Sequence, residues 1–416
     1  MSTHSHNSAL KFITCGSVDD GKSTLIGRLL IDSKSVLQDQ LAHVSKSGEA
    51  DLALFTDGLS AEREQGITID VAYRYFNTAK RKFIIGDAPG HEQYTRNMVT
   101  AASSADAAVV LVDSTKLNWK NPLPELLVQT RRHSLLLKLL RVPSIVFAIN
   151  KLDALGDNAT LAFGHIREAL RIFTQEAGIE AKAIVPISAL KGHNVVKAEP
   201  NWCGYSGESL LDILENLPNT PVDSELPFAF AVQWVERVDG KRVFWGRVST
   251  GVATVGQEIK VLPSGQTAVI AAVHNHIRVP QNVRAGHGAG IVLDREVDVS
   301  RGDWLGEDVP ASAVTQELQA TVAWLDDEPL IPGRAYWALH GHRWIKARVR
   351  RIHHRLNVNT LAEEDAHELP ANSIGHIELL LQEPVPAQPY ATSRILGSMV
   401  LVDTASHKTA GAIMVR

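Results

Sequence analysis

The chain has 416 residues, of which 44% are hydrophobic and 21% are charged, and its formal net charge is −4. This length predicts two or three domains, each with its own core, and the near-neutral charge disfavours a general nucleic-acid binder. The only cysteines, Cys15 and Cys203, exclude a disulfide framework, and no segment approaches the roughly 18 apolar residues of a membrane span. We therefore expect a cytoplasmic protein with no membrane partner.

The first half of the chain alternates apolar runs with amphipathic segments. Residues 1–10 are polar and are expected to be disordered. Within 11–217 the apolar runs predict strands at Phe12–Cys15, Phe83–Ile85, Ala107–Val112, Ser144–Ile149 and Ala183–Pro186. Helical spacing predicts helices at Ser23–Leu30, His91–Ala102, Leu126–Leu140 and Gly164–Ala177. This alternation predicts an α/β domain whose parallel sheet is covered on both faces.

The second half has a different pattern. Residues 218–227 lie in a proline-rich stretch that favours an extended linker. Beyond it, short runs rich in Val, Ile and Ala recur between turn signals such as Asp239-Gly240 and Ala285-Gly286. A second break near 307–312 separates 228–308 from 309–416, and we predict a small β-barrel in each.

The first predicted strand leads directly into a G-x-x-x-x-G-K-S string that is followed by a predicted helix. Such a loop points backbone N–H groups at phosphates. Lys22 would place its charge between the β- and γ-phosphates, and the Ser23 hydroxyl would ligate Mg²⁺. The predicted nucleotide contacts are Gly16, Ser17, Val18, Asp19, Asp20, Gly21, Lys22, Ser23 and Thr24.

Two further strings predict the surroundings of the γ-phosphate. Thr68 could offer its hydroxyl to Mg²⁺, although any edge-strand threonine would look the same. Asp87-Ala88-Pro89-Gly90-His91 follows a predicted strand, so that Asp87 could hold Mg²⁺ through water and the Gly90 amide could contact the phosphate. His91 would lie where the attacking water is positioned. Without the neighbouring motif, a single histidine at a helix start would instead be interpreted as a solvent-exposed side chain. The predicted catalytic residues are His91, Lys22 and Thr68.

Two strings near the end of the first half predict a guanine site. The Asp153 carboxylate of Asn150-Lys151-Leu152-Asp153 could accept from N1–H and the 2-amino group of guanine, which selects GTP over ATP. Ser188-Ala189-Leu190 could offer a backbone N–H to the guanine carbonyl. Four strings in this order, each at the C-terminal end of a strand, predict a site for GTP and Mg²⁺.

The chain resembles the translation-factor GTPases from Lys11 to its C-terminus, and within them the large subunit of sulfate adenylyltransferase, CysN type. The resemblance rests mainly on residues 15–30, 57–76, 91–98, 129–134 and 298–303. It implies an elongation-factor-like plan, an α/β P-loop GTPase domain followed by two β-barrels. It also implies a smaller catalytic subunit, CysD type, with which GTP hydrolysis drives formation of adenylyl sulfate and pyrophosphate from ATP and sulfate in a heterodimer or higher assembly.

Other details set this chain apart from some relatives. Some members carry a fused adenylyl-sulfate kinase with its own P-loop, and no second P-loop follows residue 23, so we expect no fused kinase. The resemblance is weaker over 113–125. Elongation factors usually have His in place of Ser17 and His or Ser in place of Asp20.

Two other functions remain open from the residues. A translation factor that delivers a charged tRNA shares the same plan, and the basic stretch Arg343–Arg355 would suit RNA. That stretch is equally typical of a solvated strand face or of a strip that binds an anion or a partner. The net charge, Ser17 and Asp20 disfavour tRNA, so we expect no nucleic-acid partner. A regulatory GTPase without an enzyme partner is the third possibility.

Overall fold

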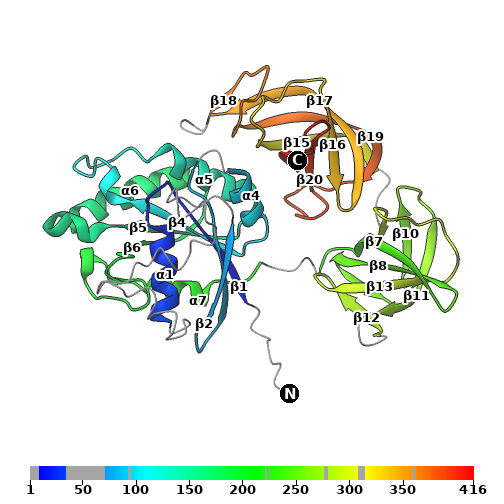
Figure 1. The fold of residues 1–416 in the computed structure, drawn as a ribbon, viewed down its shortest axis with the longest axis horizontal. Coiled ribbons are helices and arrows are strands. Elements are labelled where there is room, and N and C mark those ends of the chain that lie inside the picture. Colours follow the sequence, from blue (N-terminus) through cyan, green and yellow to red (C-terminus); the bar gives the residue numbers. More distant parts are fainter. Residues whose placement is uncertain are drawn as a thin grey trace. The chain divides into compact units, whose positions relative to one another are not determined.

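The computed structural model describes residues 9–33, 71–91, 95–220, 223, 225–275, 280–307, 314–357, 360 and 362–416. The chain divides into two compact units, one of Met1–Thr220 with Val358–Leu361 and the other of Pro221–Asn357 with Ala362–Arg416. Figure 1 shows an α/β unit and a unit built from strands, and each is described by itself.

A six-stranded sheet forms the centre of the first unit, in the order β2-β3-β1-β4-β5-β6. Its strands are β1 (Leu10–Cys15), β2 (Ala72–Asn77), β3 (Lys82–Asp87), β4 (Ala107–Asp113), β5 (Ser144–Asn150) and β6 (Ala181–Pro186). The strands that the sequence predicted run parallel to one another. The sheet also has the edge strand β2, which the sequence did not predict and which pairs antiparallel with β3.

Helices lie on both faces of this sheet (Figure 1). They are α1 (Lys22–Asp32), α4 (Thr95–Ser103), α5 (Val128–Leu139), α6 (Ala159–Glu176) and α7 (Leu210–Asn216), with the short 3-10 turns η3 (Ser114–Lys116), η4 (Leu152–Asn158) and η5 (Trp202–Gly204). On one face α1 and α7 share a buried core with β1, β3 and β4. No helix within the described ranges is long and apolar enough to cross a membrane.

The helix ends differ from the predicted ones for local reasons. Within the described part of the predicted helix 91–102, His91 is not helical and α4 covers Thr95–Ser103. The predicted helix 164–177 begins earlier, at Ala159, and its buried side chains Ala162, Phe163 and Ile166 extend the helical spacing toward its start. Helix α7 was not predicted. Ser209 caps it by accepting a hydrogen bond from the backbone N–H of Asp212 at 3.1 Å.

The second unit contains a closed barrel of strands in the order β10-β11-β13-β8-β7-β14. Its strands are β7 (Ala229–Val238), β8 (Lys241–Thr250), β10 (Glu258–Leu262), β11 (Thr267–His274), β13 (Gly288–Leu293) and β14 (Trp304–Gly306), with β9 (Val252–Thr254) and β12 (Asn282–Arg284) paired separately. The predicted turn Asp239-Gly240 joins β7 to β8, and both residues have positive φ, 50° and 80°. Two such residues are typical of a tight hairpin.

A seven-stranded sheet completes the second unit, in the order β16-β20-β21-β15-β19-β17-β18 with an additional pairing of β16 to β17. The strands are β15 (Val314–Trp324), β16 (Ala335–His340), β17 (Arg343–Leu356), β18 (Glu363–Glu364), β19 (Ile374–Pro386), β20 (Ser398–Asp403) and β21 (Thr409–Val415). The predicted fold class, an α/β domain followed by two small all-β barrels of the elongation-factor type, is confirmed, since the extra pairing of β16 with β17 closes the second sheet as well. The predicted domain limits at 217, 227 and 308 stay predictions.

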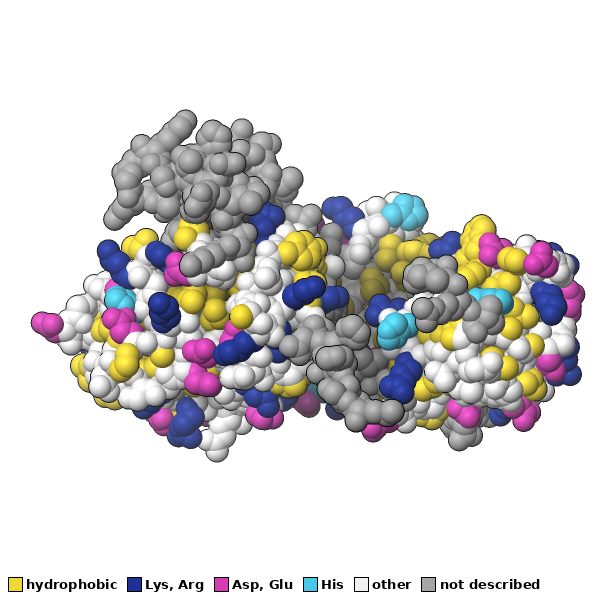
Figure 2. All heavy atoms as spheres, turned by 90° about the horizontal axis from the view of Figure 1, so that it is seen from below, with side chains coloured by type: hydrophobic (Ala, Val, Ile, Leu, Met, Phe, Trp, Pro, Cys, Tyr) yellow, Lys and Arg dark blue, Asp and Glu magenta, His cyan; other side chains and the backbone are white. Residues whose placement is uncertain are grey.

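The basic stretch Arg343–Arg355 lies on β17, where buried and exposed residues alternate over much of the strand. Acidic side chains neutralise several of its arginines: Arg343 lies 2.6 Å from Asp303, and Arg350 lies 3.0 Å from Glu378. These ion pairs favour the strand-face interpretation of the stretch over an RNA-binding one. On the face drawn in Figure 2, Lys and Arg are likewise interspersed with Asp and Glu among the described residues.

Candidate nucleotide-binding site

The predicted phosphate loop connects the end of β1 to the start of α1. Gly21, directly before the helix, has a φ of 92°, a left-handed value that side chains avoid. A Cβ atom at this position would lie 2.5 Å from Nδ2 of Asn150. Glycine is therefore required both by the turn and by the close approach of the asparagine.

The Lys22 side chain lies at the centre of this loop. It is only 6% exposed, and its Nζ donates to the backbone oxygens of Ser17, at 2.8 Å, and Gly16, at 3.4 Å. Burial lowers the pKa of Lys22, and the neighbouring carboxylates of Asp87 and Asp20 oppose that shift. An ammonium group has three donors, so Lys22 can keep contacts with its own loop while it binds phosphate.

Oxygen ligands suited to Mg²⁺ gather beside Lys22. The Ser23 hydroxyl lies 3.4 Å from Oδ2 of the buried Asp87 at the end of β3, and Thr14 donates to Oδ1 of Asp87 at 3.2 Å. Mg²⁺ prefers such hard oxygen donors and keeps several waters, so these residues fit the ion. Thr68, the third predicted ligand, lies outside the described residues.

The segment Ala88–His91 follows Asp87 and packs against the phosphate loop. A Cβ on Gly90 would lie 2.8 Å from the backbone oxygen of Gly16, so only glycine lets the two backbones approach this closely. From α5, Gln129 donates to the Gly90 oxygen at 3.4 Å, a contact that the sequence did not reveal. His91 is exposed at the end of this segment.

A buried asparagine joins the phosphate loop to the predicted guanine loop. Asn150, at the end of β5, is 2% exposed, and its Nδ2 donates to the backbone oxygen of Asp20 at 2.8 Å. Its Oδ1 accepts from the N–H of Ala189 at 3.0 Å. Asn150 therefore holds the two loops in a fixed position relative to each other.

A network of charges, which the sequence analysis missed, surrounds this asparagine. Lys151 Nζ lies 2.8 Å from Oδ2 of Asp113 at the end of β4, and Lys116 Nζ lies 3.3 Å from Oδ1 of Asp20. Burial raises the pKa of Asp113, but contacts from Lys151 and Thr115 outweigh it and hold this pKa below its usual value. Burial raises the pKa of Asp20, against the charges of Lys22 and Lys116. In the sequence, the one sign of this network was that Asp113 directly follows a predicted strand.

The remaining predicted guanine contacts lie on neighbouring loops. Asp153 is half-buried in η4, directly after β5. The backbone of 188–190 is held by Arg28 of α1, whose Nε donates to the Ala189 oxygen at 3.2 Å and whose Nη2 donates to that of Leu190. The four predicted motifs thus follow β1, β3, β5 and β6, at the carboxyl edge of the sheet, apart from Thr68. Ligands of open α/β sheets bind at this edge.

Comparisons with known proteins identify the same kind of domain. Residues 7–221 match the elongation factor Tu GTP binding domain, and residues 317–416 match the GTP-eEF1A C-terminal domain-like family. The chain is 45% identical over 413 residues to "Bifunctional enzyme CysN/CysC" of Xylella fastidiosa, covering 97% of this chain and 65% of that protein. It is 43% identical over 421 residues to "Sulfate adenylyltransferase subunit 1" of Cronobacter sakazakii, covering 99% and 87%.

The same name belongs to a relative from Vibrio campbellii, which is 44% identical over 426 residues, with 100% of this chain and 88% of that protein covered. The chain therefore spans most of the length of the subunit 1 proteins. It spans less than two thirds of the bifunctional enzyme.

Proposed function

Because the chain belongs to the family of sulfate adenylyltransferase subunit 1, we propose that it hydrolyses GTP to drive the formation of adenylyl sulfate and pyrophosphate from ATP and sulfate. The GTPase role in sulfate activation is favoured over translation elongation, because the identity extends over the whole chain and not only over the GTP-binding domain. A subunit 1 acts with a partner, and we propose that this partner is the smaller catalytic subunit, CysD type.

The observation that carries the nucleotide part is the bridge made by Asn150 between Asp20 and Ala189. The bridge joins the loop of Gly16–Thr24 to residues 188–190, which supports assigning the phosphates to the first and guanine to the second. In this proposal Lys22 and the loop amides hold the phosphates, and Asp153 with the amides of 188–190 reads the base. Ser23 and Thr68 would hold Mg²⁺ directly, and Asp87 through water.

Hydrolysis can drive the partner only if the two states of this subunit bind the partner differently. The geometry offers a route for such a difference, since Gly90 contacts the phosphate loop directly and His91 follows it. We propose that Gly90 responds to the γ-phosphate and that the His91 imidazole orients the attacking water.

His91→Ala tests the coupling. Loss of a positioned acid–base group typically costs ~10²–10⁴-fold in rate, so GTP hydrolysis should collapse while GTP affinity is kept. Synthesis of adenylyl sulfate by the complex should fall in step. The measurement is the parallel initial rates of phosphate and adenylyl-sulfate release from the complex with its small subunit.

His367→Ala is the matched control, because His367 is an exposed histidine of the second unit. Its two rates should equal those of the wild type. If His91→Ala makes adenylyl sulfate rapidly while hydrolysis has stopped, GTP binding rather than hydrolysis is the driver. If the complex makes adenylyl sulfate with no response to GTP at all, the proposed function itself is wrong.

Three further statements remain predictions from the sequence: the cytoplasmic location, the lack of a nucleic-acid partner and the lack of a fused kinase. Assay of the complex for adenylyl-sulfate phosphorylation tests the last of these.

A further inference from the structure

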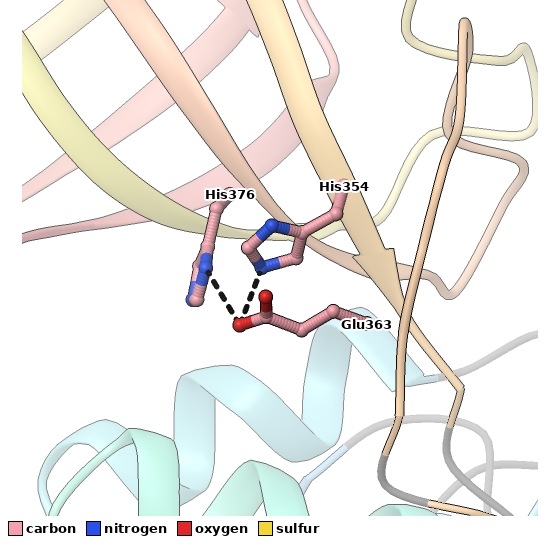
Figure 3. Close-up of side chains that lie close together, drawn as sticks. All are labelled: His354, Glu363 and His376. Carbon is pink, nitrogen blue, oxygen red and sulfur yellow. Dashed lines mark ion pairs between the residues drawn. The ribbon is translucent and has the colours of Figure 1, made fainter.

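A cluster of two histidines and a glutamate lies in the second unit and has no part in the nucleotide site. We propose that His354, Glu363 and His376 bind a divalent transition-metal ion such as Zn²⁺. One ligand atom from each residue lies within 4.8 Å of the others. Figure 3 shows both imidazole rings beside the same carboxylate.

The strand register brings these three residues together. His354 on β17 lies directly opposite His376 on β19. On the other side of β17, Leu356 lies opposite Glu363 on β18. Residues 354 and 356 are two positions apart on one strand and so face the same side of the sheet. The three side chains therefore come from three adjacent strands and meet on one face.

The two interatomic distances lie on either side of the separation expected for ligands that share an ion. His354 Nε2 lies 3.0 Å from Oε1 of Glu363, and His376 Nδ1 lies 3.9 Å from the same oxygen. In a tetrahedral zinc site, bonds of about 2.0–2.1 Å place neighbouring ligand atoms roughly 3.3 Å apart. The two rings approach edge to face, with centroids 4.2 Å apart and planes at 70°.

The orientation of His354 also favours an ion over a simple hydrogen bond. Its Nε2 is buried and has no aligned hydrogen-bond partner, although the Glu363 oxygen is only 3.0 Å away. A nitrogen and an oxygen that bind one ion lie close together, and each directs its lone pair at the ion instead of at the other ligand. An ion between the two atoms would give this buried nitrogen an aligned partner.

The ligand types indicate the class of metal. Two imidazole nitrogens and one carboxylate oxygen suit Zn²⁺ and other first-row divalent ions, and Ca²⁺ and Mg²⁺ prefer oxygen alone. A histidine binds such an ion through a neutral imidazole nitrogen. Three protein ligands leave a position for water or an external group.

Arg416 competes for this site. Its Nη1 lies 2.8 Å from Nδ1 of His376, and because a guanidinium only donates, Nδ1 is the acceptor. The metal would take the same lone pair. The Arg416 side chain is exposed and can turn away into solvent, but both its charge and its hydrogen bond weaken metal binding.

The test measures Zn²⁺ binding to the full chain by competition with a chromogenic chelator, with saturating GDP and Mg²⁺ present to block the nucleotide site. His4→Ala with His6→Ala is the background, because these two histidines could bind metal on their own. We expect about one Zn²⁺ per chain, and a higher melting temperature with Zn²⁺, since an ion that binds only the folded state stabilises it.

His354→Ala, Glu363→Gln and His376→Ala should each weaken Zn²⁺ binding by at least about tenfold. His353→Ala is the matched control, because the adjacent His353 is exposed and contacts Gln319 instead. Arg416→Ala should tighten binding. If either histidine variant fails to fold, Glu363→Gln decides, because the Glu363 side chain is 62% exposed.

Two results would overturn the assignment. One is the absence of Zn²⁺ binding in the background protein. The other is equal binding by Glu363→Gln and His353→Ala. Unchanged or weaker binding by Arg416→Ala would contradict the role of His376 Nδ1 as a ligand.

Discussion

The nucleotide site has a base end, which includes Asn150, Lys151 and Asp153, and a phosphate end, which includes Lys22, Ser23 and Asp87. The two ends differ in the contacts that hold their polar side chains. At the base end Asn150 has a hydrogen-bond partner on each of two loops, and Lys151 is paired with Asp113. At the phosphate end Lys22 contacts carbonyls of its own loop, and Ser23 lies 3.4 Å from Asp87.

This difference has a physical meaning. Buried bonds between separate loops maintain the fold and its geometry, whereas groups that meet phosphate and Mg²⁺ need donors and oxygens left for the ligand. We therefore expect changes at the phosphate end to act on binding and rate, and changes at the base end to act on stability as well.

The largest effect is expected for Lys22→Ala. Removing a positioned cation that stabilises developing phosphate charge typically costs ~10²–10³-fold in rate, and GTP affinity should fall too. Removing Lys22 removes the desolvation cost of its own charge but leaves the buried carboxylates of Asp20 and Asp87 without this cation, so the melting temperature without nucleotide should fall, but less than in Asn150→Ala. The measurements are single-turnover GTP hydrolysis and thermal unfolding. Normal turnover in this variant would refute the phosphate-loop assignment.

Asn150→Ala probes the base end. It leaves the oxygen of Asp20 and the N–H of Ala189 unsatisfied in a buried place, and each such group costs about 1–3 kcal/mol. The melting temperature without nucleotide should therefore fall by about 5–15 °C. Asn150→Asp keeps the acceptor for Ala189 but places a buried carboxylate against the oxygen of Asp20, so its melting temperature should fall at least as far. Equal melting temperatures for Asn150→Ala and the wild type would remove the contrast between the two ends.

Much of this site was predictable because each nucleotide motif is contiguous in sequence. The phosphate loop, Asp87–His91 and Asn150–Asp153 each need only a preceding strand to define their position. The contacts between motifs were not predictable. Asp113, Lys116 and Gln129 join them across distant segments, and a single sequence does not reveal such pairs.

The same limit applies to the fold and to the histidine cluster. The buried parallel strands were predicted from apolar runs, whereas β2, of sequence AYRYFN, is largely exposed and lacks such a run. His354, Glu363 and His376 have spacings that match no metal motif. Only the pairing of β17 with β18 and β19 brings them together.

Asp153→Asn sharpens the comparison at the base itself. Replacing the carboxylate removes an acceptor for the guanine donors and supplies an amide donor for the 2-oxygen of xanthine. Hydrogen bonds to charged groups contribute about 1.5–3 kcal/mol, so GTP affinity should fall roughly 10–100-fold and XTP affinity should rise. Asp153 is half-buried at the surface, so stability should be kept. Calorimetric titration with GTP, XTP and ATP measures this, and equal wild-type affinity for ATP and GTP would contradict the guanine assignment.

The smallest effect is expected for Arg28→Ala, because Arg28 contacts only the backbone of the predicted guanine loop, residues 188–190, and would not contact the base itself. Arg28 donates to the oxygens of Ala189 and Leu190 and also lies 3.6 Å from Asp32. Its side chain is 22% exposed, so water can replace part of what is lost, and one or two hydrogen bonds are worth about 0.5–1.5 kcal/mol each. GTP and GDP share the base, so both affinities should fall by the same ~2–10-fold, with the hydrolysis rate of bound GTP unchanged.

Arg28→Lys keeps the charge near Asp32 but cannot reach both carbonyls with a fixed fork, so it separates the ion pair from the loop contacts. We expect it to lose most of the same affinity. Binding of a fluorescent GDP analogue, with competition by GTP, measures both ligands in one assay. If the affinity for GTP fell while that for GDP stayed the same, Arg28 would affect binding of the γ-phosphate and not of the base. That result would then show that the two ends are coupled through α1, whose first residue is Lys22 and which also carries Arg28.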